Sequence, residues 1–452
     1  MQVWGEKPAI FWKDLKITYS QFLGHIATWE SRLADDGVTA GSICAFKGDF
    51  SPSTCALMFA LIKKNAILVP FTNEISAEIP GFMEIAGVET LYRFDSADLA
   101  AMEKINAPPF PPLIQKFSGR GHAGLIVFTS GSTGAPKAIL HDCESVMRKF
   151  VVQRHAWDTI LFLLMDHFGG FNTFLSSFAN GGMAVCPQVR TAEGVARAIQ
   201  ESRATLLPTT PTFLNLIIMS RLYLAYDFSS VKMITYGTEL MSDTLLKRVV
   251  EVFPNAQIKQ TYGLSELGVL RSNSESKDSV WLKVGGSGFE VKVVGGKLWV
   301  RSESNMVGYL NAPSPFDEEG WMCTGDEVEQ RGEFIRFLGR KSEVINVGGQ
   351  KVYPIEVEDV LLKADNVSSA VVFSKTHPVM GQVVHAQVSL LEPESATQLT
   401  ERLRRFCNER LPKYKVPMRF EIASEQSQHS RRFKKIRRDT LQDGSPETRE
   451  SQ

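Results

Sequence analysis

The stretch VFTSGSTGAPKAIL (127–140) contains six consecutive Thr, Ser or Gly residues, Thr129 to Gly134, followed by Ala-Pro-Lys. The apolar run GLIVF (124–128) that leads into it is typical of a buried strand, and residues 142–153 have a helical pattern. Small residues let backbone N–H groups approach a ligand closely, and the hydroxyls and the Lys137 ammonium add donors. The stretch therefore predicts a loop that binds a polyphosphate.

Two other interpretations of this loop fit less well. It does not match the G-x-x-x-x-G-K-[ST] phosphate loop, because Lys137 lies three residues after Gly134 and Pro136 precedes it. A flexible Ser/Thr/Gly linker is the plainer alternative. We disfavour the linker because an apolar strand pattern leads directly into the run and a lysine closes it.

Length and charge set broad limits. With 452 residues the chain is long enough for two or three domains with a large core. Lys plus Arg and Asp plus Glu both number 50, so no overall field favours nucleic acid or a membrane surface. A charged ligand must therefore be held by a local site.

The cysteines and the N-terminus suggest the compartment. The six cysteines form no C-x-x-C pair and no metal-ligand spacing, which predicts reduced thiols in a cytosolic protein. The start, MQVWGEKPAIFWKDLK, lacks an apolar signal region, and no later run approaches the roughly 18 apolar residues of a membrane span. We expect a cytoplasmic protein without membrane insertion.

Outward from the loop, short apolar runs alternate with amphipathic ones. Strand patterns at 42–46 and 66–71 flank a helical pattern at 51–65, and similar alternation recurs from 183 to 263. This predicts an α/β fold with doubly wound sheets. A proline-rich linker is expected at 106–117, just before the loop.

The pattern of expected strands and helices changes towards the C-terminus. Glycine-punctuated strands at 289–302 and 332–340 predict a small β-rich subdomain that completes a large N-terminal domain, residues 1–340. Strand patterns and a helical pattern then predict a small, mobile α+β C-terminal domain over residues 341–440. The polar segment 441–452 is expected to be disordered.

The loop sequence FTSGSTGAPKAIL resembles the phosphate loop of the adenylate-forming superfamily, which contains acyl- and aryl-CoA ligases, peptide-synthetase adenylation domains and firefly-type luciferases. A second stretch, TYGLSELG (261–268), resembles another signature of that family. The resemblance implies that Tyr262 stacks on adenine, Glu266 holds Mg²⁺ and Thr261 lies near the α-phosphate. Alone, a Tyr-Gly turn after a strand is more often structural.

Two further motifs follow the family pattern. YGTEL (236–240) resembles, more loosely, the turn that lines the adenine, with Tyr236 in place of the usual small residue. WMCTGDEVE resembles the motif whose aspartate, here Asp326, binds the ribose hydroxyls, and Arg340 would contact ribose or phosphate. The resemblance thus implies one set of ATP-binding residues: Thr129, Ser130, Gly131, Ser132, Thr133, Gly134, Lys137, Tyr236, Gly237, Thr238, Tyr262, Gly263, Asp326 and Arg340.

The stretch MDHFGGFNTF (165–174) matches the family's H-x-x-G pattern beside the acyl pocket. His167, with Phe168 and Phe171, would shape where the substrate carboxylate lies. A histidine packed in the core is the plainer alternative. Asp166, next to it, could anchor a substrate ammonium group or simply be a turn residue.

The C-terminal motifs depart from the family in two places. The hinge position, usually Asp or Lys, is Ser342, and the loop 346–349, with Gly348 and Gly349, would face the thiol acceptor. RRFKKIRRDTL (431–441) resembles the segment that carries the catalytic lysine. The usual glycine is replaced by Lys434, and the register with Ile436 and Arg438 favours Lys435 as the acting residue.

The sequence therefore predicts an enzyme, an AMP-forming acid–thiol ligase that uses ATP, Mg²⁺ and a carboxylic acid. The acid would become an acyl-AMP with release of pyrophosphate, and a thiol, CoA before others, would then take the acyl group. Apolar stretches favour an aryl or medium-chain acid. Three alternatives remain: loading of an acyl or amino acid onto a carrier protein in trans, a non-catalytic binding module, and a nucleic-acid binder through the basic residues of 431–438, which the neutral balance disfavours.

Overall fold

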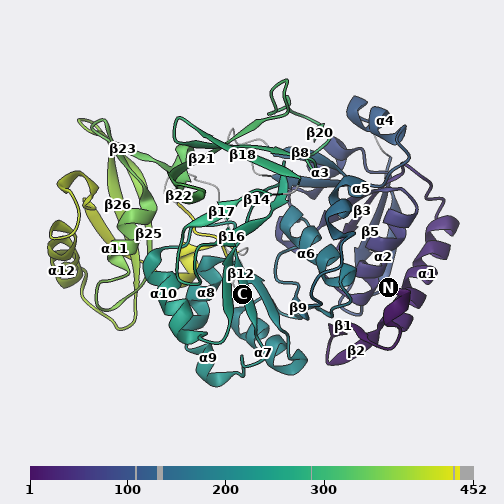
Figure 1. Ribbon diagram of the computed structural model, residues 1–452, viewed down its shortest axis with the longest axis horizontal. Coiled ribbons are helices and arrows are strands. Elements are labelled where there is room, and N and C mark those ends of the chain that lie inside the picture. Colours follow the sequence, from purple (N-terminus) through teal and green to yellow (C-terminus); the bar gives the residue numbers. More distant parts are fainter. Residues whose placement is uncertain (107–108, 130–135, 287, 431–432, 438–452) are drawn as a thin grey trace, which may run out of the picture.

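The computed structural model describes residues 1–106, 109–129, 136–286, 288–430 and 433–437. Two large sheets and their helices form the right and centre of the molecule, and a small lobe with α11 (Pro354–Leu361) and α12 (Ala396–Asn408) lies at the left (Figure 1). A third sheet runs across the top of the view between them. The expected α/β architecture, with a large N-terminal part and a small C-terminal part, is confirmed.

The first seven-stranded sheet has the order β20-β8-β7-β4-β3-β5-β6, with β7, β4, β3 and β5 parallel. Its strands are β3 (Ile43–Lys47), β4 (Ile67–Phe71), β5 (Thr90–Phe94), β6 (Ala100–Lys104), β7 (Gly124–Thr129), β8 (Lys137–Asp142) and β20 (Gly308–Tyr309). Its helices are α1 (Tyr19–Asp35), α2 (Pro52–Lys63), α3 (Ile79–Ala86), α4 (Pro112–Ser118) and α5 (Cys143–Met147). Helix α2 begins where Pro52 follows the N-cap residue Ser51, whose hydroxyl accepts the Thr54 N–H.

The second seven-stranded sheet has the order β13-β12-β11-β9-β10-β1-β2, parallel except for the β1–β2 pair. Its strands are β1 (Pro8–Trp12), β2 (Leu15–Thr18), β9 (Thr159–Ile160), β10 (Ala184–Val185), β11 (Leu206–Thr209), β12 (Met233–Tyr236) and β13 (Gln257–Gln260). Its helices are α6 (Phe168–Ala179), α7 (Ala192–Ser202), α8 (Pro211–Met219), α9 (Leu222–Ala225) and α10 (Asp243–Val252). The predicted alternation of strands and helices is therefore present in both halves.

The remaining sheets are mainly antiparallel. A six-stranded sheet has the order β16-β17-β22-β21-β19-β18, beside the β14–β15 hairpin. Their strands are β14 (Tyr262–Leu264), β15 (Gly268–Leu270), β16 (Ser272–Ser274), β17 (Leu282–Val284), β18 (Phe289–Val294), β19 (Lys297–Ser302), β21 (Met322–Arg331) and β22 (Phe334–Arg340). The lobe at the left has the order β24-β23-β26-β25, with β27 on β26. Its strands are β23 (Ile345–Val347), β24 (Gln350–Val352), β25 (Val367–His377), β26 (Gly381–Leu390) and β27 (Arg419–Ile422).

Short 3₁₀ turns join several of these elements. They are η1 (Gln2–Trp4), η2 (Asn73–Ile75), η3 (Arg148–Phe150), η4 (Lys341–Glu343), η5 (Lys413–Lys415) and η6 (Glu425–Gln428). No helix in the described ranges combines the length and the apolar character that crossing a bilayer requires.

Two local predictions were wrong. The expected linker at 106–117 contains α4, whose Ile114 and Phe117 are buried because they pack in one cluster with strand residues of the first sheet. The expected helix at 142–153 is shorter, since α5 ends at Met147 and a 3₁₀ turn follows. Strand β8 precedes it, so the phosphate-loop segment connects two antiparallel strands instead of a strand and a helix.

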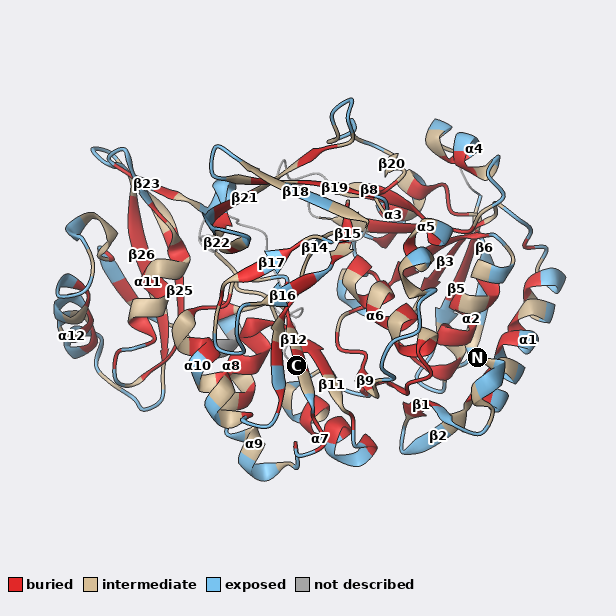
Figure 2. Cartoon of the chain, viewed as in Figure 1, coloured by how far each residue is buried: buried red, intermediate tan, exposed pale blue. Residues whose placement is uncertain are grey.

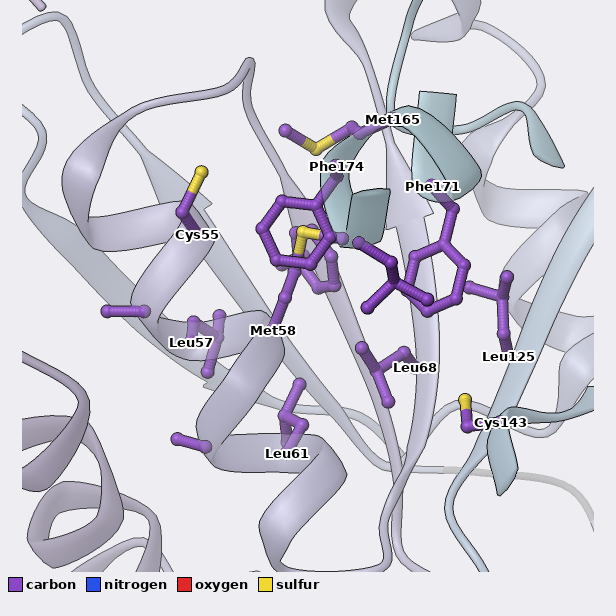
Figure 3. Close-up of a cluster of buried hydrophobic side chains, with 14 of the residues drawn as sticks. Cys55, Leu57, Met58, Leu61, Leu68, Leu125, Cys143, Met165, Phe171 and Phe174 are labelled. Carbon is purple, nitrogen blue, oxygen red and sulfur yellow. The ribbon is translucent and has the colours of Figure 1, made fainter. Parts of the chain in front are cut away.

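A large core cluster holds α2 and α6 against the first sheet. Leu57, Met58 and Leu61 of α2 belong to one cluster with Phe171 and Phe174 of α6, and the close-up also labels Leu68 and Leu125 from the sheet (Figure 3). The central strands are buried along most of their length, while the outer faces of helices such as α12 are exposed (Figure 2). Each such apolar side chain contributes about 1.5–3 kcal/mol on burial. This packing fixes the position of α6 against the first sheet.

Candidate functional site

A cavity of about 1030 Å³ lies where the two seven-stranded sheets, the six-stranded sheet and the C-terminal segment meet. Such a volume suits a nucleotide-sized ligand. Many residues singled out from the sequence line it. They are Thr129, Lys137, Asp166, His167, Thr238, Gly263, Glu266, Arg340, Ser342 and Lys434.

Both ends of the phosphate-loop segment are fixed at the cavity wall. Thr129 ends β7 and Lys137 begins β8, and the two residues are paired in the antiparallel ladder. Asn311 holds the far end, since its Nδ2 donates to the Pro136 carbonyl at 2.9 Å and its Oδ1 accepts the Ala138 N–H at 3.0 Å. Ser130, Gly131, Ser132, Thr133 and Gly134 lie outside the described residues.

Lys137, Tyr309 and Glu266 form one cluster on this wall. The Lys137 ammonium lies 5.1 Å from the Tyr309 ring centroid, and the Tyr309 hydroxyl donates to Glu266 Oε1 at 2.7 Å. Burial, with the nearby Glu266 charge, raises the pKa of Tyr309 above its ordinary value, so the hydroxyl remains a donor. The sequence analysis missed Tyr309, because only its pairing in β20 with β8 brings it here.

The residues present fit a magnesium ion that is shared with a phosphate. Glu266 gives the cavity a carboxylate, the hard oxygen ligand that Mg²⁺ prefers. Within the described residues, no group of three or more His, Cys, Asp or Glu side chains could hold a metal by themselves. Magnesium commonly takes one or two carboxylates and completes its shell with water and substrate phosphates.

Tyr262, Asp326 and Arg340 form a second cluster beside the cavity. The Tyr262 hydroxyl donates to Asp326 Oδ2 at 2.6 Å, and Arg340 Nε donates to Asp326 Oδ1 at 3.2 Å. Burial raises the pKa of Asp326, while the Arg340 charge opposes this. Phe337, which the sequence analysis missed, stacks on Tyr262 at 4.5 Å, so at most the opposite face of Tyr262 is left for a base.

The turn 236–238 and Thr261 sit side by side, but not all of them face the cavity. The Tyr236 side chain is buried in the core of the second sheet, contrary to the adenine-lining position expected for it. The Thr261 hydroxyl donates to the Tyr236 carbonyl at 3.0 Å. A Cβ on Gly237 would lie 2.6 Å from Thr261 Oγ1, so this close approach requires glycine. Thr238 lines the cavity with a left-handed φ of 66°.

His167 caps α6 at the cavity. Its Nδ1 accepts the Gly169 N–H at 3.3 Å. Gly170 is required because a Cβ there would lie 1.9 Å from the Leu164 carbonyl oxygen. Phe168 and Phe171, both on α6, are buried in the core cluster, and neither lines the large cavity or the small one beside His167.

Asp166 and a small second cavity adjoin His167. Asp166 is buried, and its Oδ2 accepts the Thr72 hydroxyl at 2.9 Å. The second cavity has a volume of about 30 Å³ and shares His167, Thr238 and Lys434 with the first. Its other lining residues are Phe162, Leu163, Leu164, Arg190, Thr210 and Phe433.

The two C-terminal lysines lie on different sides of the chain. Lys434 lines both cavities. The Lys435 ammonium, expected to act in catalysis, instead donates to Glu358 Oε2 at 2.8 Å and to the Ala370 carbonyl at 3.0 Å. This placement differs from the expectation because Glu358, on α11, is fully buried and takes Lys435 as a partner. Sequence spacing gives no signal for a contact between residues 77 positions apart.

The hinge and thiol-loop residues are also separated. Ser342 lines the cavity within η4. Gly348 and Gly349 form the turn of the β23–β24 hairpin with φ values of 55° and 86°, a conformation that favours glycine. Neither glycine lines either of these cavities.

This fold and cavity define an adenylate-forming enzyme, an AMP-forming acid–thiol ligase. Doubly wound sheets precede a small C-terminal domain, and the cavity is lined by Lys137 and Glu266, with the cluster of Tyr262, Asp326 and Arg340 beside it. The chain belongs to the AMP-binding enzyme family. The family's main domain matches residues 1–310, and the AMP-binding enzyme C-terminal domain matches residues 356–434.

Similar proteins include several CoA ligases. An indoleacetate–CoA ligase from Aromatoleum aromaticum is 26% identical over 468 residues, which cover 91% of this chain and 90% of that protein. A 2-succinylbenzoate–CoA ligase from Bacillus cereus is 26% identical over 445 residues, which cover 91% of this chain and 90% of that protein. An o-succinylbenzoate CoA synthetase from Bacillus subtilis, solved with an acyl-adenylate intermediate, has a TM-score of 0.73 at 21% identity, covering 97% of this chain and 96% of that chain.

Proposed function

We propose that this protein converts an aromatic or arylalkanoic acid to its CoA thioester through an acyl-AMP. The carboxylate oxygen attacks the α-phosphorus of ATP, and the bond to pyrophosphate breaks with its electron pair leaving on pyrophosphate. The CoA thiol then attacks the acyl carbonyl and AMP leaves. The observation that carries the proposal is the cavity that joins Lys137, Glu266 and Arg340 to His167 and a C-terminal lysine.

The cavity residues divide between the two ends of ATP. Lys137 and the donors of the 129–134 loop would hold the β and γ phosphates and the departing pyrophosphate. Arg340, Thr238 and Gly263 line the cavity. Beside them, Tyr262 would support the adenine, Asp326 together with Arg340 the ribose, and Thr261, next to Gly237, the region of the α-phosphate. Glu266 would hold Mg²⁺, which when bound offsets charge on the phosphates.

The acid would enter beside His167. Phe162, Leu163 and Leu164 line the small cavity that adjoins this residue and offer apolar contacts to an aromatic or alkyl group. Arg190 and Lys434 line it too and could pair with the carboxylate. Indoleacetate and 2-succinylbenzoate, which the names of two relatives give as substrates, both carry an aromatic ring. We therefore propose an aromatic ring near the carboxylate of the substrate.

The domain division supports a two-step reaction. We assign residues 1–340 to the nucleotide- and acid-binding domain and 341–440 to a mobile C-terminal domain, because strand membership passes to another sheet after Arg340. Ser342 would then be the hinge, and rotation about it would exchange the Lys434 segment for the turn at Gly348 and Gly349 when CoA reacts.

The test is acid-dependent exchange of labelled pyrophosphate into ATP, run on a panel of aromatic, arylalkanoic and aliphatic acids. We expect exchange with at least one aromatic acid, followed by thioester formation with CoA, and a strong loss of exchange in Glu266→Gln. Adenylation without a CoA thioester, but with transfer to a phosphopantetheinyl carrier protein, would favour the carrier-loading alternative. Absence of exchange across the panel would favour a non-catalytic module.

A further inference from the structure

We propose that Lys434, rather than Lys435, is the catalytic lysine of acyl-AMP formation. This inference rests on the proposed function and deepens it, because it assigns the acting group one residue before the position that the family motif indicates. Two adjacent lysines stand in this segment, and the structure gives them different surroundings.

Lys435 is held by three contacts, two within the C-terminal domain and one to the N-terminal domain. Its ammonium donates to Glu358 Oε2 at 2.8 Å and to the Ala370 carbonyl at 3.0 Å, and its backbone N–H donates to Glu239 Oε1 at 2.6 Å. Glu358 is fully buried, and the charges of Arg437 and Lys435 hold its pKa below the ordinary value although burial acts in the opposite direction. Withdrawing the ammonium would leave a buried carboxylate with fewer partners, which is unfavourable.

Lys434 instead faces the ligand space. It lines the large cavity together with Lys137, Arg340 and His167, and it also lines the small cavity beside His167. Lys435 forms an antiparallel bridge with His429, and successive side chains in such extended backbone point to opposite sides. The contact of Lys435 with Glu358 therefore directs Lys434 towards the cavity.

Anchors on the preceding residue hold this register. The Phe433 carbonyl accepts the Thr210 hydroxyl at 2.8 Å, and the Phe433 ring packs against Phe213 at 5.0 Å and Phe162 at 5.6 Å. The backbone is thus tied to the N-terminal domain at Phe433 and, through Glu239, at Lys435. A shift by one residue that brought Lys435 to the cavity would break both ties.

Acyl-AMP formation requires a fixed positive charge near the α-phosphorus and no proton transfer. As the carboxylate oxygen bonds to the α-phosphorus and pyrophosphate leaves, negative charge builds on the oxygens around that phosphorus. The Lys434 ammonium would donate hydrogen bonds to those oxygens and remain protonated throughout. Lys435 would keep the segment in place by its pair with Glu358.

The experiment compares Lys434→Ala with Lys435→Gln. The second variant removes the positive charge of Lys435 but keeps a side-chain donor for Glu358. Pyrophosphate–ATP exchange is measured with an acid that the wild type accepts, and thioester formation is measured separately from preformed acyl-AMP and CoA. We expect Lys434→Ala to lower exchange by about 100-fold or more, mostly in kcat, while thioester formation changes little. Lys435→Gln should keep exchange within about 5-fold and lower the melting temperature instead.

Lys434→Arg is the conservative variant and should recover part of the exchange because it restores the charge. Comparable loss in folded Lys435→Gln, or exchange retained in Lys434→Ala, overturns the assignment while the proposed function stands. If Lys435→Gln does not fold, Lys435→Met, in which Glu358 keeps its hydrogen bond from Arg437, serves the same comparison. A folded wild type without exchange for any acid refutes the proposed function and this inference with it.

Discussion

The end of the phosphate-loop segment allows a direct test of which half of the reaction it serves. Lys137 begins β8 at the cavity wall, with its ammonium over the Tyr309 ring. Lys137→Ala removes that positive charge but leaves the β7–β8 ladder intact, because the ladder is formed by backbone groups. The change should therefore alter phosphate binding and not the fold.

The size of the effect follows from one lost contact with a charged group. A hydrogen bond to an ionised partner contributes about 1.5–3 kcal/mol, which corresponds to about 10- to 150-fold in rate or affinity. Since β and γ phosphates are present only in the first half-reaction, pyrophosphate–ATP exchange should fall by that factor. Thioester formation from preformed acyl-AMP and CoA, which involves neither phosphate, should change less than about 2-fold.

Two variants serve as controls for Lys137→Ala. Lys137→Arg keeps the charge and should recover most of the exchange. Tyr309→Phe keeps the ring under the ammonium and removes only the 2.7 Å hydrogen bond to Glu266. Its effect on exchange therefore reports the contribution of Glu266 separately from that of Lys137. Equal losses in both half-reactions of Lys137→Ala would refute the assignment of Lys137 to the departing pyrophosphate.

Three further changes test other parts of the site. Tyr262→Phe keeps the ring but removes the 2.6 Å hydrogen bond to Asp326, and it should raise the KM for ATP by about 10-fold; an unchanged KM would contradict this. Burial lowers the pKa of His141 to about 3, so below about pH 6.5 the unfolded chain binds a proton that the folded chain does not, and the free energy of unfolding should fall by about 2 kcal/mol between pH 7 and pH 5. Urea unfolding should show this fall in the wild type and a smaller one in His141→Leu. Gly170→Ala places a Cβ 1.9 Å from a backbone carbonyl oxygen and should cost about 1–3 kcal/mol of stability, whereas Gly169→Ala, whose Cβ meets only a side chain at 3.2 Å, should cost less in the same urea assay.

Much of the fold was predictable because its strands and helices have strong local patterns. The expected strands at 42–46 and 66–71 correspond to β3 and β4, and the helix between them begins at a Ser-Pro cap that the sequence displays. The glycine-punctuated strands expected at 289–302 are also present, as the antiparallel pair β18 and β19 with Phe289 opposite Ser302. In these segments local preference and tertiary packing favour the same structure.

The errors arose where tertiary contacts decide the local structure. Three apolar residues, 138–140, are too few for periodicity to separate a strand from the start of a helix, and pairing with β7 and β20 makes them a strand. Tyr236 has the right place in its motif, but its ring packs in the core because its strand, β12, lies between β11 and β13 of the second sheet. The sequence also cannot choose between two adjacent lysines, since a glutamate 77 residues away determines which one faces the cavity.

The cavity combines groups that are held in place beforehand with one group that arrives on a separate segment. Arg340 is paired with Asp326, and Glu266 is held by Tyr309, so these groups need little rearrangement when charge develops on a phosphate. Lys434 is different, because it lies on the C-terminal segment, where its neighbours Phe433 and Lys435 are hydrogen-bonded to the N-terminal domain. The N-terminal domain would therefore bind ATP in either arrangement, whereas the positive charge needed at the α-phosphate is present only when that segment is docked. Control of acyl-AMP formation would then lie in the docking of this segment and not in the affinity for ATP.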